Sequence, residues 1–283
     1  MHLVKFAPTG QNVARWGWME TQTGPIHTFR EHDGPTRLVD LLRDKDLVAR
    51  ARSSREETDV VALEDARLLA PLDDQEVWGA GVTYLRSKTA RQEESPQGAS
   101  FYDLVYRAAR PELFFKASPH RVVDPGQPIM VRRDTRWCVP EPELTLVLAP
   151  DLRLVGFTVG DDVSARDIEG ENPLYLPQAK IYDGCCALGP WITIGSAMPE
   201  RSAIRIELRI RRGEQVVTRG ETSIAQMARS FEEIIDWLGR DNSFPTGVFV
   251  LTGTGIVPDD SFSLEAGDLV EIGIDGIGTL INP

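Results

Sequence analysis

The sequence predicts a mixed α/β protein in which β structure predominates, with a small α/β unit at the N-terminus. Two observations carry this prediction. From Leu68 onwards, short runs rich in β-branched and aromatic residues are separated by Gly, Pro and Asp, which is typical of β-strands. One segment with helical spacing interrupts them, and this argues against the strand–helix alternation of a doubly wound parallel sheet. The predicted strands are 76–82, 127–132, 143–149, 153–160, 190–195, 204–210, 248–253 and 269–274.

The first 70 residues differ in texture from the rest, and we expect them to form a separate small domain. Residues 3–7 and 14–20 could form a strand pair, and 36–51 carries apolar residues at helical spacing. The polar and charged segment 52–60 is a candidate connection between units. The predicted domains are residues 1–70 and residues 71–283.

The strongest helical pattern lies at 223–242. Its apolar residues recur three or four positions apart, which places them on one face of a helix. Ser223 is suited to the N-cap position. We therefore expect one continuous helix here, packed against the sheet. The apolar residues of this face are Ile224, Met227, Phe231, Ile234 and Leu238.

A polar stretch, 85–100, separates two segments with clearer patterns. Its composition alone indicates a solvated loop. Long polar loops in compact domains also often cover active sites, so a lid is the alternative interpretation.

Composition excludes several classes of protein. Acidic residues outnumber Lys and Arg by 43 to 31, and a net charge of -12 argues against nucleic-acid binding. Three cysteines without C-x-x-C spacing predict neither a disulfide framework nor structural zinc, and the adjacent Cys185 and Cys186 are expected to pack rather than react. No apolar stretch approaches 18 residues, and no signal-peptide pattern opens the chain. We expect a cytoplasmic enzyme without membrane partners.

The strongest chemical constellation is the sequence Pro-Glu-Pro-Glu at 140–143, followed by two strand-like runs. In an extended chain Glu141 and Glu143 share one face. A hairpin about Asp151 places position 162 opposite position 141, so Asp162 joins the two glutamates, with Asp161 as the competing third ligand. Three clustered carboxylates favour a hard cation such as Mg²⁺, Mn²⁺ or Ca²⁺. The alternative is a pair of glutamates that face solvent on an edge strand.

These residues resemble the metal-binding core of the fumarylacetoacetate hydrolase superfamily. The resemblance rests on E-P-E-L, on V-G-F-T-V-G-D-D-V-S-A-R-D and on later motifs in the family's order, and it covers roughly 71–283. It implies a β-sandwich roll, and it implies that Glu141, Glu143 and Asp162 hold Mg²⁺ or another divalent ion. It also implies a homodimer or homotetramer. The later motifs are Lys180, Leu188-Gly189-Pro190, Thr252-Gly253-Thr254, and GDLVEIGIDGIGTLIN at 267–282.

Three further segments, 81–87, 110–119 and 172–190, are similar to the branch of that superfamily that contains 2-keto-3-deoxy-D-arabinonate dehydratase. This narrower resemblance implies that Lys180 and Glu112 act in catalysis. It also implies a 2-keto acid substrate. The residues implied to contact this substrate are Thr254, Gly253, Tyr84 and Arg86. Without the resemblance, Lys180 would be read as a surface lysine, and the TGTG sequence at 252–255 as a tight turn.

One departure from the hydrolase pattern separates the functional hypotheses. Fumarylacetoacetate hydrolases use a histidine near the start of the catalytic domain to activate water, whereas 81–95 contains none. We therefore expect a hydro-lyase that converts a 2-keto-3-deoxy pentonate to 2,5-dioxopentanoate and water. Lys180 would act as the base, because a neighbouring dication disfavours its ammonium form, and Glu112 would move the proton. The alternatives are a hydrolase or decarboxylase of a β-diketo acid such as an acylpyruvate and, more remotely, a non-catalytic sugar-acid binding protein.

Overall fold

The computed structural model describes all residues except 31, 33 and 86–103, and it is mostly β, as predicted. A 12-stranded sheet forms the largest layer, and its strand order is β4-β3-β2-β1-β13-β11-β10-β16-β6-β7, with β5 beside β1 and β8 beside β13. Its strands are β1 (His2–Pro8), β2 (Arg15–Met19), β3 (Ile26–Phe29), β4 (Arg55–Val61), β5 (Ala66–Leu68), β6 (Glu76–Gly81), β7 (Glu112–Ala117), β8 (Val122–Val123), β10 (Pro142–Leu148), β11 (Leu154–Asp162), β13 (Cys186–Ile194) and β16 (Val248–Leu251).

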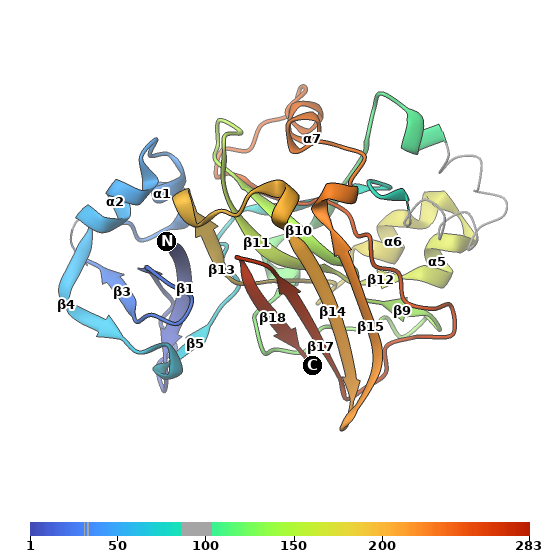
Figure 1. Cartoon of the computed structure of the whole chain (residues 1–283), viewed down its shortest axis with the longest axis horizontal. Helices are drawn as coiled ribbons and strands as arrows, with labels where there is room; N and C mark the ends of the chain where they lie inside the picture. Colours follow the sequence, from blue (N-terminus) through green and yellow to red (C-terminus); the bar gives the residue numbers. More distant parts are fainter. Residues whose placement is uncertain (31, 33, 86–103) are drawn as a thin grey trace.

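A second sheet of four strands, in the order β15-β14-β17-β18, packs against this layer (Figure 1). Its strands alternate buried and exposed residues, because one face meets the core and the other faces outward. By contrast, every residue of the central strands β10 and β13 is buried, since these strands lie between two apolar layers. The four strands are β14 (Arg205–Arg212), β15 (Gln215–Ser223), β17 (Asp268–Ile274) and β18 (Gly278–Asn282).

The N-terminal residues form an α/β unit, drawn in blue in Figure 1. The predicted strand pair is confirmed, because β1 and β2 pair antiparallel. The expected helix at 36–51 is instead two helices, α1 (Leu38–Leu42) and α2 (Leu47–Ser53), because Asp46 caps the second through the backbone N–H of Ala49. The segment 52–60, expected to be a connection, largely forms the edge strand β4.

Strand β1 joins the N-terminal unit to the rest of the chain. It pairs with β2 along one side, and with β13 and then β5 along the other. The hydrogen-bonded ladder of the large sheet is therefore continuous across the division at residue 70, and that division stays a prediction.

The prediction of one helix over 223–242 is wrong at its N-terminal half. The structure contains a 3₁₀ turn at Ile224–Gln226 and a separate helix, α7 (Phe231–Leu238). Ser223 caps the turn, whereas Ser230 caps α7 by accepting the backbone N–H of Glu233. Because each serine can cap a helical turn, the segment forms two short helical elements instead of one continuous helix.

The remaining short elements lie near the ends of β10 and β11. They are β9 (Cys138–Val139), β12 (Ser164–Ala165), α5 (Arg166–Glu171) and α6 (Leu176–Lys180). In the described ranges of the chain, no helix has the length and apolarity that crossing a membrane requires.

Candidate active site

The hairpin of β10 and β11 brings the predicted acidic residues together. Pro142 lies opposite Asp161, and the backbone N–H of Asp162 donates to the carbonyl of Glu141 at 3.0 Å. This is the register predicted from the turn at Asp151. The alternation along β10 then directs Glu141 and Glu143 to the same face.

Glu141, Glu143 and Asp162 form a compact carboxylate cluster, called the acidic triad below. One oxygen from each lies within 4.8 Å of the others, and each side chain is at most 3% exposed. The triad contradicts the alternative of solvent-facing glutamates. Asp161, which competed with Asp162 on sequence grounds, instead accepts the backbone N–H of Glu141 at 3.0 Å.

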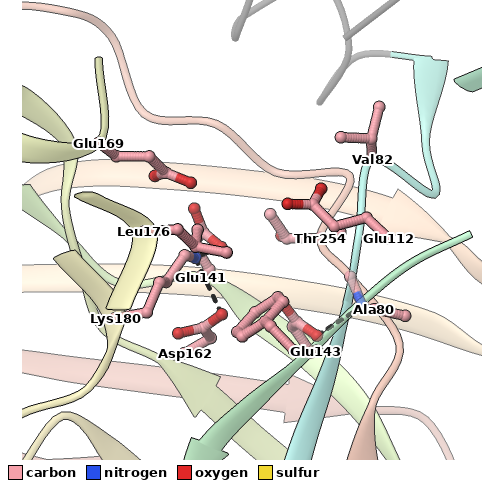
Figure 2. Close-up of a pocket in the computed structure, with 13 residues that line it drawn as sticks. Ala80, Val82, Glu112, Glu141, Glu143, Asp162, Glu169, Leu176, Lys180 and Thr254 are labelled. Atoms are coloured by element: carbon pink, nitrogen blue, oxygen red, sulfur yellow. Dashed lines mark hydrogen bonds and ion pairs between the residues drawn. The ribbon is translucent and has the colours of Figure 1, made fainter. Parts of the chain in front are cut away.

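Three buried cations surround the acidic triad. The Nζ of Lys180 lies 2.7 Å from Glu141 Oε2 and 2.9 Å from Asp162 Oδ2 (Figure 2). Arg166 approaches the other oxygen of Glu141 at 2.9 Å. Lys116 contacts Asp162 Oδ1 at 2.5 Å. Charged groups at this depth persist because each has partners of opposite sign.

Lys116 links three segments of the site. Besides Asp162, its ammonium donates to the carbonyl of Val163 at 3.0 Å and to that of Lys180 at 2.6 Å. Burial acts against its charged form, but Asp162 together with Cys185 and Cys186 outweighs this effect, so the pKa of Lys116 lies above its ordinary value. This lysine therefore holds a triad carboxylate and the C-terminal end of α6 in fixed positions.

The turn after β16 holds the remaining acid of the triad. The backbone N–H of Gly253 donates to Glu143 Oε2 at 2.5 Å. Gly253 has φ +88°, and a Cβ there would lie 2.1 Å from Thr83 Oγ1. Only glycine fits both the conformation and the space. Thr254 follows it, is 3% exposed, and lines the pocket.

A pocket lies above the triad. Figure 2 shows Glu112 and Thr254 across this pocket from Lys180 and Glu169. Glu112 comes from the first residue of β7 and packs against Gly81, where a Cβ would lie 2.2 Å from its Oε2. Two predicted catalytic side chains therefore flank one cavity.

Electrostatics in the site disfavour the ionised carboxylates. Burial, followed by the charges of Asp162 and Glu141, raises the pKa of Glu143 well above its ordinary value. Burial and the charge of Asp162 raise the pKa of Asp161 to about 8. A hard cation between the triad oxygens would favour the ionised forms. The donor set of three carboxylates fits Mg²⁺ and fits zinc poorly, because zinc proteins prefer nitrogen and sulfur ligands.

One predicted substrate-binding residue, Tyr84, does not line this pocket. Tyr84 is 1% exposed and lies behind Gly255, where a Cβ would be 2.7 Å from its ring. Burial and the charge of Glu143 raise the pKa of Tyr84. Arg86, and residues 86–100 of the predicted lid at 85–100, lie outside the described residues.

Sequence reasoning missed Lys116, Phe114 and Glu169. Phe114 and Lys116 follow Glu112 at steps of two along β7, so strand alternation could have placed these three residues on the face of the site. Glu169 lies three residues after Arg166 on α5, and both are buried, so helical spacing could have paired them.

The adjacent cysteines keep the packing role predicted for them, and Asp167 also has a structural role. Cys185 and Cys186 are buried free thiols, and burial raises the pKa of Cys186 well above its ordinary value, as expected of packing residues. Asp167 accepts a hydrogen bond from Thr135 and another, at 2.8 Å, from the backbone N–H of Arg136. It therefore anchors the loop before β9.

The fold and the acidic triad define a class of protein that comparison identifies. Residues 76–283 match the family model described as fumarylacetoacetate hydrolase, C-terminal, and the chain belongs to this family.

More specific relatives are sugar-acid dehydratases. A probable 2-keto-3-deoxyxylonate dehydratase of Haloferax volcanii is 47% identical over 229 residues, which cover 80% of this chain and 78% of that protein. The 2-dehydro-3-deoxy-D-arabinonate dehydratase of Saccharolobus solfataricus is 46% identical over 224 residues, 78% of this chain and 75% of the relative. A solved structure of 2-keto-3-deoxy-D-arabinonate dehydratase complexed with magnesium and 2,5-dioxopentanoate superimposes with a TM-score of 0.83 at 37% identity, covering 100% of this chain and 98% of the other.

Proposed function

We propose that this protein is a magnesium-dependent hydro-lyase that converts a 2-keto-3-deoxy pentonate, with 2-keto-3-deoxy-D-arabinonate as the first candidate, to 2,5-dioxopentanoate and water. The observation that carries the proposal is one pocket that combines the acidic triad with Lys180 on one wall and Glu112 on the other. The sugar-acid dehydratases among its relatives support the same reaction class.

In this proposal Glu141, Glu143 and Asp162 hold the Mg²⁺. The bound ion would supply a Lewis acid for the keto and carboxylate oxygens at C2 and C1 of the substrate. Mn²⁺ and Ca²⁺ are the substitutes that an all-oxygen donor set predicts. The Gly253 turn fixes Glu143, and Thr254 supplies a hydroxyl beside the substrate carboxylate.

Lys180 removes a proton from C3 in the proposed reaction. Lys180 is 2% exposed. Its Nζ is positioned by hydrogen bonds to Glu141, Asp162 and Ser164 Oγ, the last at 2.6 Å. Exclusion of water from this wall strengthens each of these contacts. Lys116 also positions Lys180, because its ammonium donates a hydrogen bond to the backbone carbonyl of Lys180.

Glu112 donates a proton to the departing C4 hydroxyl, which leaves as water. A proton then moves from C5 to C3, and the resulting C4–C5 enol tautomerises to the aldehyde at C5. Glu112 faces the cavity from the wall opposite Lys180. Lys180 therefore acts on the C3 proton, and Glu112 acts on the C4 hydroxyl. Glu169, also on the pocket wall, is a carboxylate available to bind substrate hydroxyl groups.

The decisive experiment is turnover of a panel of 2-keto-3-deoxy acids, with the semialdehyde detected through a coupled dehydrogenase. We expect conversion of a C5 substrate, loss of turnover after EDTA treatment, and recovery on addition of Mg²⁺. Undiminished turnover by metal-free protein would contradict the role of the triad. Absence of product with every member of the panel would contradict the reaction class.

A second candidate function is hydrolysis or decarboxylation of an acylpyruvate. Among the described residues that line the pocket there is no histidine to activate water, which favours the dehydratase. Acetylpyruvate is the discriminating substrate, and its cleavage by the metal-loaded protein would favour the second candidate. The non-catalytic binding protein is disfavoured because it needs no paired acid and base. The cytoplasmic location and the homo-oligomeric state stay predictions.

A further inference from the structure

The position of Glu112 in the pocket depends on how the start of strand β7 is held. Glu112 is the first residue of β7 and lies opposite Gly81, the last residue of β6. Among the described strands, β7 ends the order of the large sheet, and β6 is its paired neighbour. The end of an edge strand opens easily, because few hydrogen bonds hold it. A proton donor at this place therefore requires support from outside the sheet.

Arg229 places a buried cation beside the segment that leads into β7. The residue is 6% exposed, and its Nη2 donates to the carbonyls of Val105 and Ala108 at 2.9 and 2.7 Å. Its Nη1 donates to the carbonyl of Ala109 at 3.4 Å. Residues 104–107 are helical, and the last carbonyls of a helical segment lack partners within that segment. Arg229 therefore caps this segment shortly before β7 begins.

Arg229 is itself fixed against the core of the molecule. Its guanidinium contacts the carboxylate of Glu233 on α7, and Arg201 donates to its backbone carbonyl at 2.8 Å. Its neighbours Met227 and Phe231 belong to the buried core between the two sheets. An arginine that is held in this way keeps the segment that it caps at a constant position relative to the core.

Two residues separate the capped segment from Glu112, and both are restrained. Pro111 is buried, and its ring fixes the backbone angle φ at this point of the chain. The guanidinium of Arg110 lies 4.4 Å from the ring centre of Trp237 on α7, within the range of a cation–π contact. A displacement of the capped segment would therefore be passed on to Glu112.

We propose that Arg229 is a positioning residue for Glu112, an inference that rests on the role of Glu112 as proton donor in the proposed function. Lys116 holds β7 on the C-terminal side of Glu112, and Arg229 holds the chain on its N-terminal side. Arg229 is not among the described residues that line the pocket, so it acts on the reaction through Glu112.

Kinetics separate this role from a purely structural one. A residue that only stabilises the fold affects the amount of folded protein. A residue that positions the proton donor instead affects the step that uses this donor, so its loss lowers kcat and kcat/KM together and leaves KM unchanged.

The first test is R229M, which removes the hydrogen-bond donors and keeps a long side chain. We expect kcat to fall about 10- to 10²-fold, because displacing a reacting group by about 1 Å costs about 10²-fold. KM and the affinity for Mg²⁺ should not change, since the acidic triad and Thr254 stay in place. R229K can still pair with Glu233 and donate to a carbonyl, so it should recover part of kcat.

R153M is the matched control. Arg153 also donates to backbone carbonyls, those of Leu42 and Asp44 at 3.1 and 2.9 Å, but it follows the turn between β10 and β11. R153M removes the same kind of hydrogen bond far along the chain from Glu112 and should keep the wild-type kcat. An equal fall of kcat in R153M and R229M would assign a structural role to Arg229.

A double-variant cycle with E112Q tests whether Arg229 acts through Glu112. The proposed proton donor is absent from E112Q, so adding R229M to this background should lower kcat no further. An equal loss in both backgrounds, or a wild-type kcat for R229M, would overturn the proposal. If R229M does not fold, E233Q takes its place in the cycle, because it removes only the charge that orients Arg229. The same outcomes then decide, with a smaller loss expected.

Hydrogen exchange of the Mg²⁺-loaded protein tests the same inference without substrate. R229M should accelerate exchange of the backbone amides of 105–113, that of Glu112 included, whereas R153M should leave them unchanged. Acceleration that ends at Ala109 would overturn the positioning of Glu112. A wild-type protein that converts no member of the substrate panel would overturn the proposed function, and the exchange measurement would still decide whether Arg229 positions Glu112.

Discussion

The acidic triad and the outer face of the four-stranded sheet use the same kinds of side chain in opposite physical settings. Around the acidic triad, Lys116, Lys180 and Arg166 are at most 2% exposed and are held by carboxylates of the triad. On the outer face of the sheet, Arg205 and Glu221 pair while more than half exposed. Burial makes the loss of one partner costly, whereas water replaces a surface partner at little cost. A charge therefore specifies geometry around the triad, whereas on the outer face it contributes little to the fold.

The largest expected effect comes from Lys180→Ala. Loss of a general base should reduce turnover by about 10²- to 10⁴-fold, while the acidic triad remains to bind Mg²⁺. Steady-state kinetics and Mg²⁺ titration by calorimetry measure the two properties separately. Lys5→Ala removes a lysine of the N-terminal unit that pairs with Asp73, and this variant should keep wild-type turnover. Wild-type turnover by Lys180→Ala would show that another group is the base.

Lys116→Met should give the largest loss of stability. It leaves Asp162 without a cation that contacts it at 2.5 Å, and breaking a buried ion pair costs about 3–5 kcal/mol. Urea unfolding of the metal-free protein measures this loss. Lys116→Arg retains the charge and should recover part of the stability. A loss below about 1 kcal/mol for the methionine variant would show that the buried pair is no more important than a surface pair.

Two buried aspartates, Asp161 beside the acidic triad and Asp268 on the core-facing side of β17, should change the pH dependence of stability in opposite directions. The pKa of Asp161 is raised to about 8 by burial and by Asp162, so the folded state retains a proton that the unfolded state has lost. Stability of the metal-free protein therefore falls as pH rises from about 4 to about 8. Asp161→Asn removes this fall, and urea midpoints across that range measure it.

The pKa of Asp268, the first residue of β17, is shifted in the opposite direction. Burial acts to raise its pKa, but the hydrogen bonds from Arg212, the backbone N–H of Glu265 and the charge of Arg212 together outweigh burial and lower it. Its contribution is present at neutral pH and is lost as pH falls through its pKa. Asp268→Asn should therefore destabilise the protein at pH 7 and have little effect in acid. Parallel curves for the Asp161→Asn and Asp268→Asn variants would contradict the contrast between the two aspartates.

The smallest expected effect is that of Arg240→Ala. This residue follows the end of α7 and pairs with Asp236 of that helix, and both side chains are more than half exposed. Pairs of this kind contribute less than about 1 kcal/mol. Urea unfolding gives the baseline against which Lys116→Met is judged, and a loss as large as that of Lys116→Met would remove the distinction between buried and exposed pairs.

The sequence predicts the part of the site that depends on local rules. Alternation along β10 and a turn at Asp151 suffice to bring Glu141, Glu143 and Asp162 together, because both rules operate within one hairpin. The role of Lys180 as a buried group came from a family resemblance, since nothing near it in the sequence distinguishes it from a surface lysine. Its burial depends on β10, β11 and β12, which lie 15 or more residues earlier in the chain.

Elements that depend on competition between local signals were predicted less well. A continuous apolar stripe indicated a helix from Ser223, but Met227 forms a bridge with Tyr84, and Ser230 starts the helix anew. The polar segment 52–60 reads as a connection, yet an edge strand such as β4 tolerates charged side chains because one of its sides faces solvent. In both cases a distant part of the chain decides the outcome.

Strand β7 has a consequence for how this active site can diversify. It lies at the edge of the large sheet, with β6 as its neighbour, and it carries Glu112 and Lys116 on one face. Its pairing with β6, together with the contacts of Lys116 with Asp162 and with the carbonyls of Val163 and Lys180, sets how far Glu112 stands from the triad. Changes in the outward-facing residues of this strand can therefore retune the substrate range of the enzyme over evolutionary time, while the metal ligands remain the same.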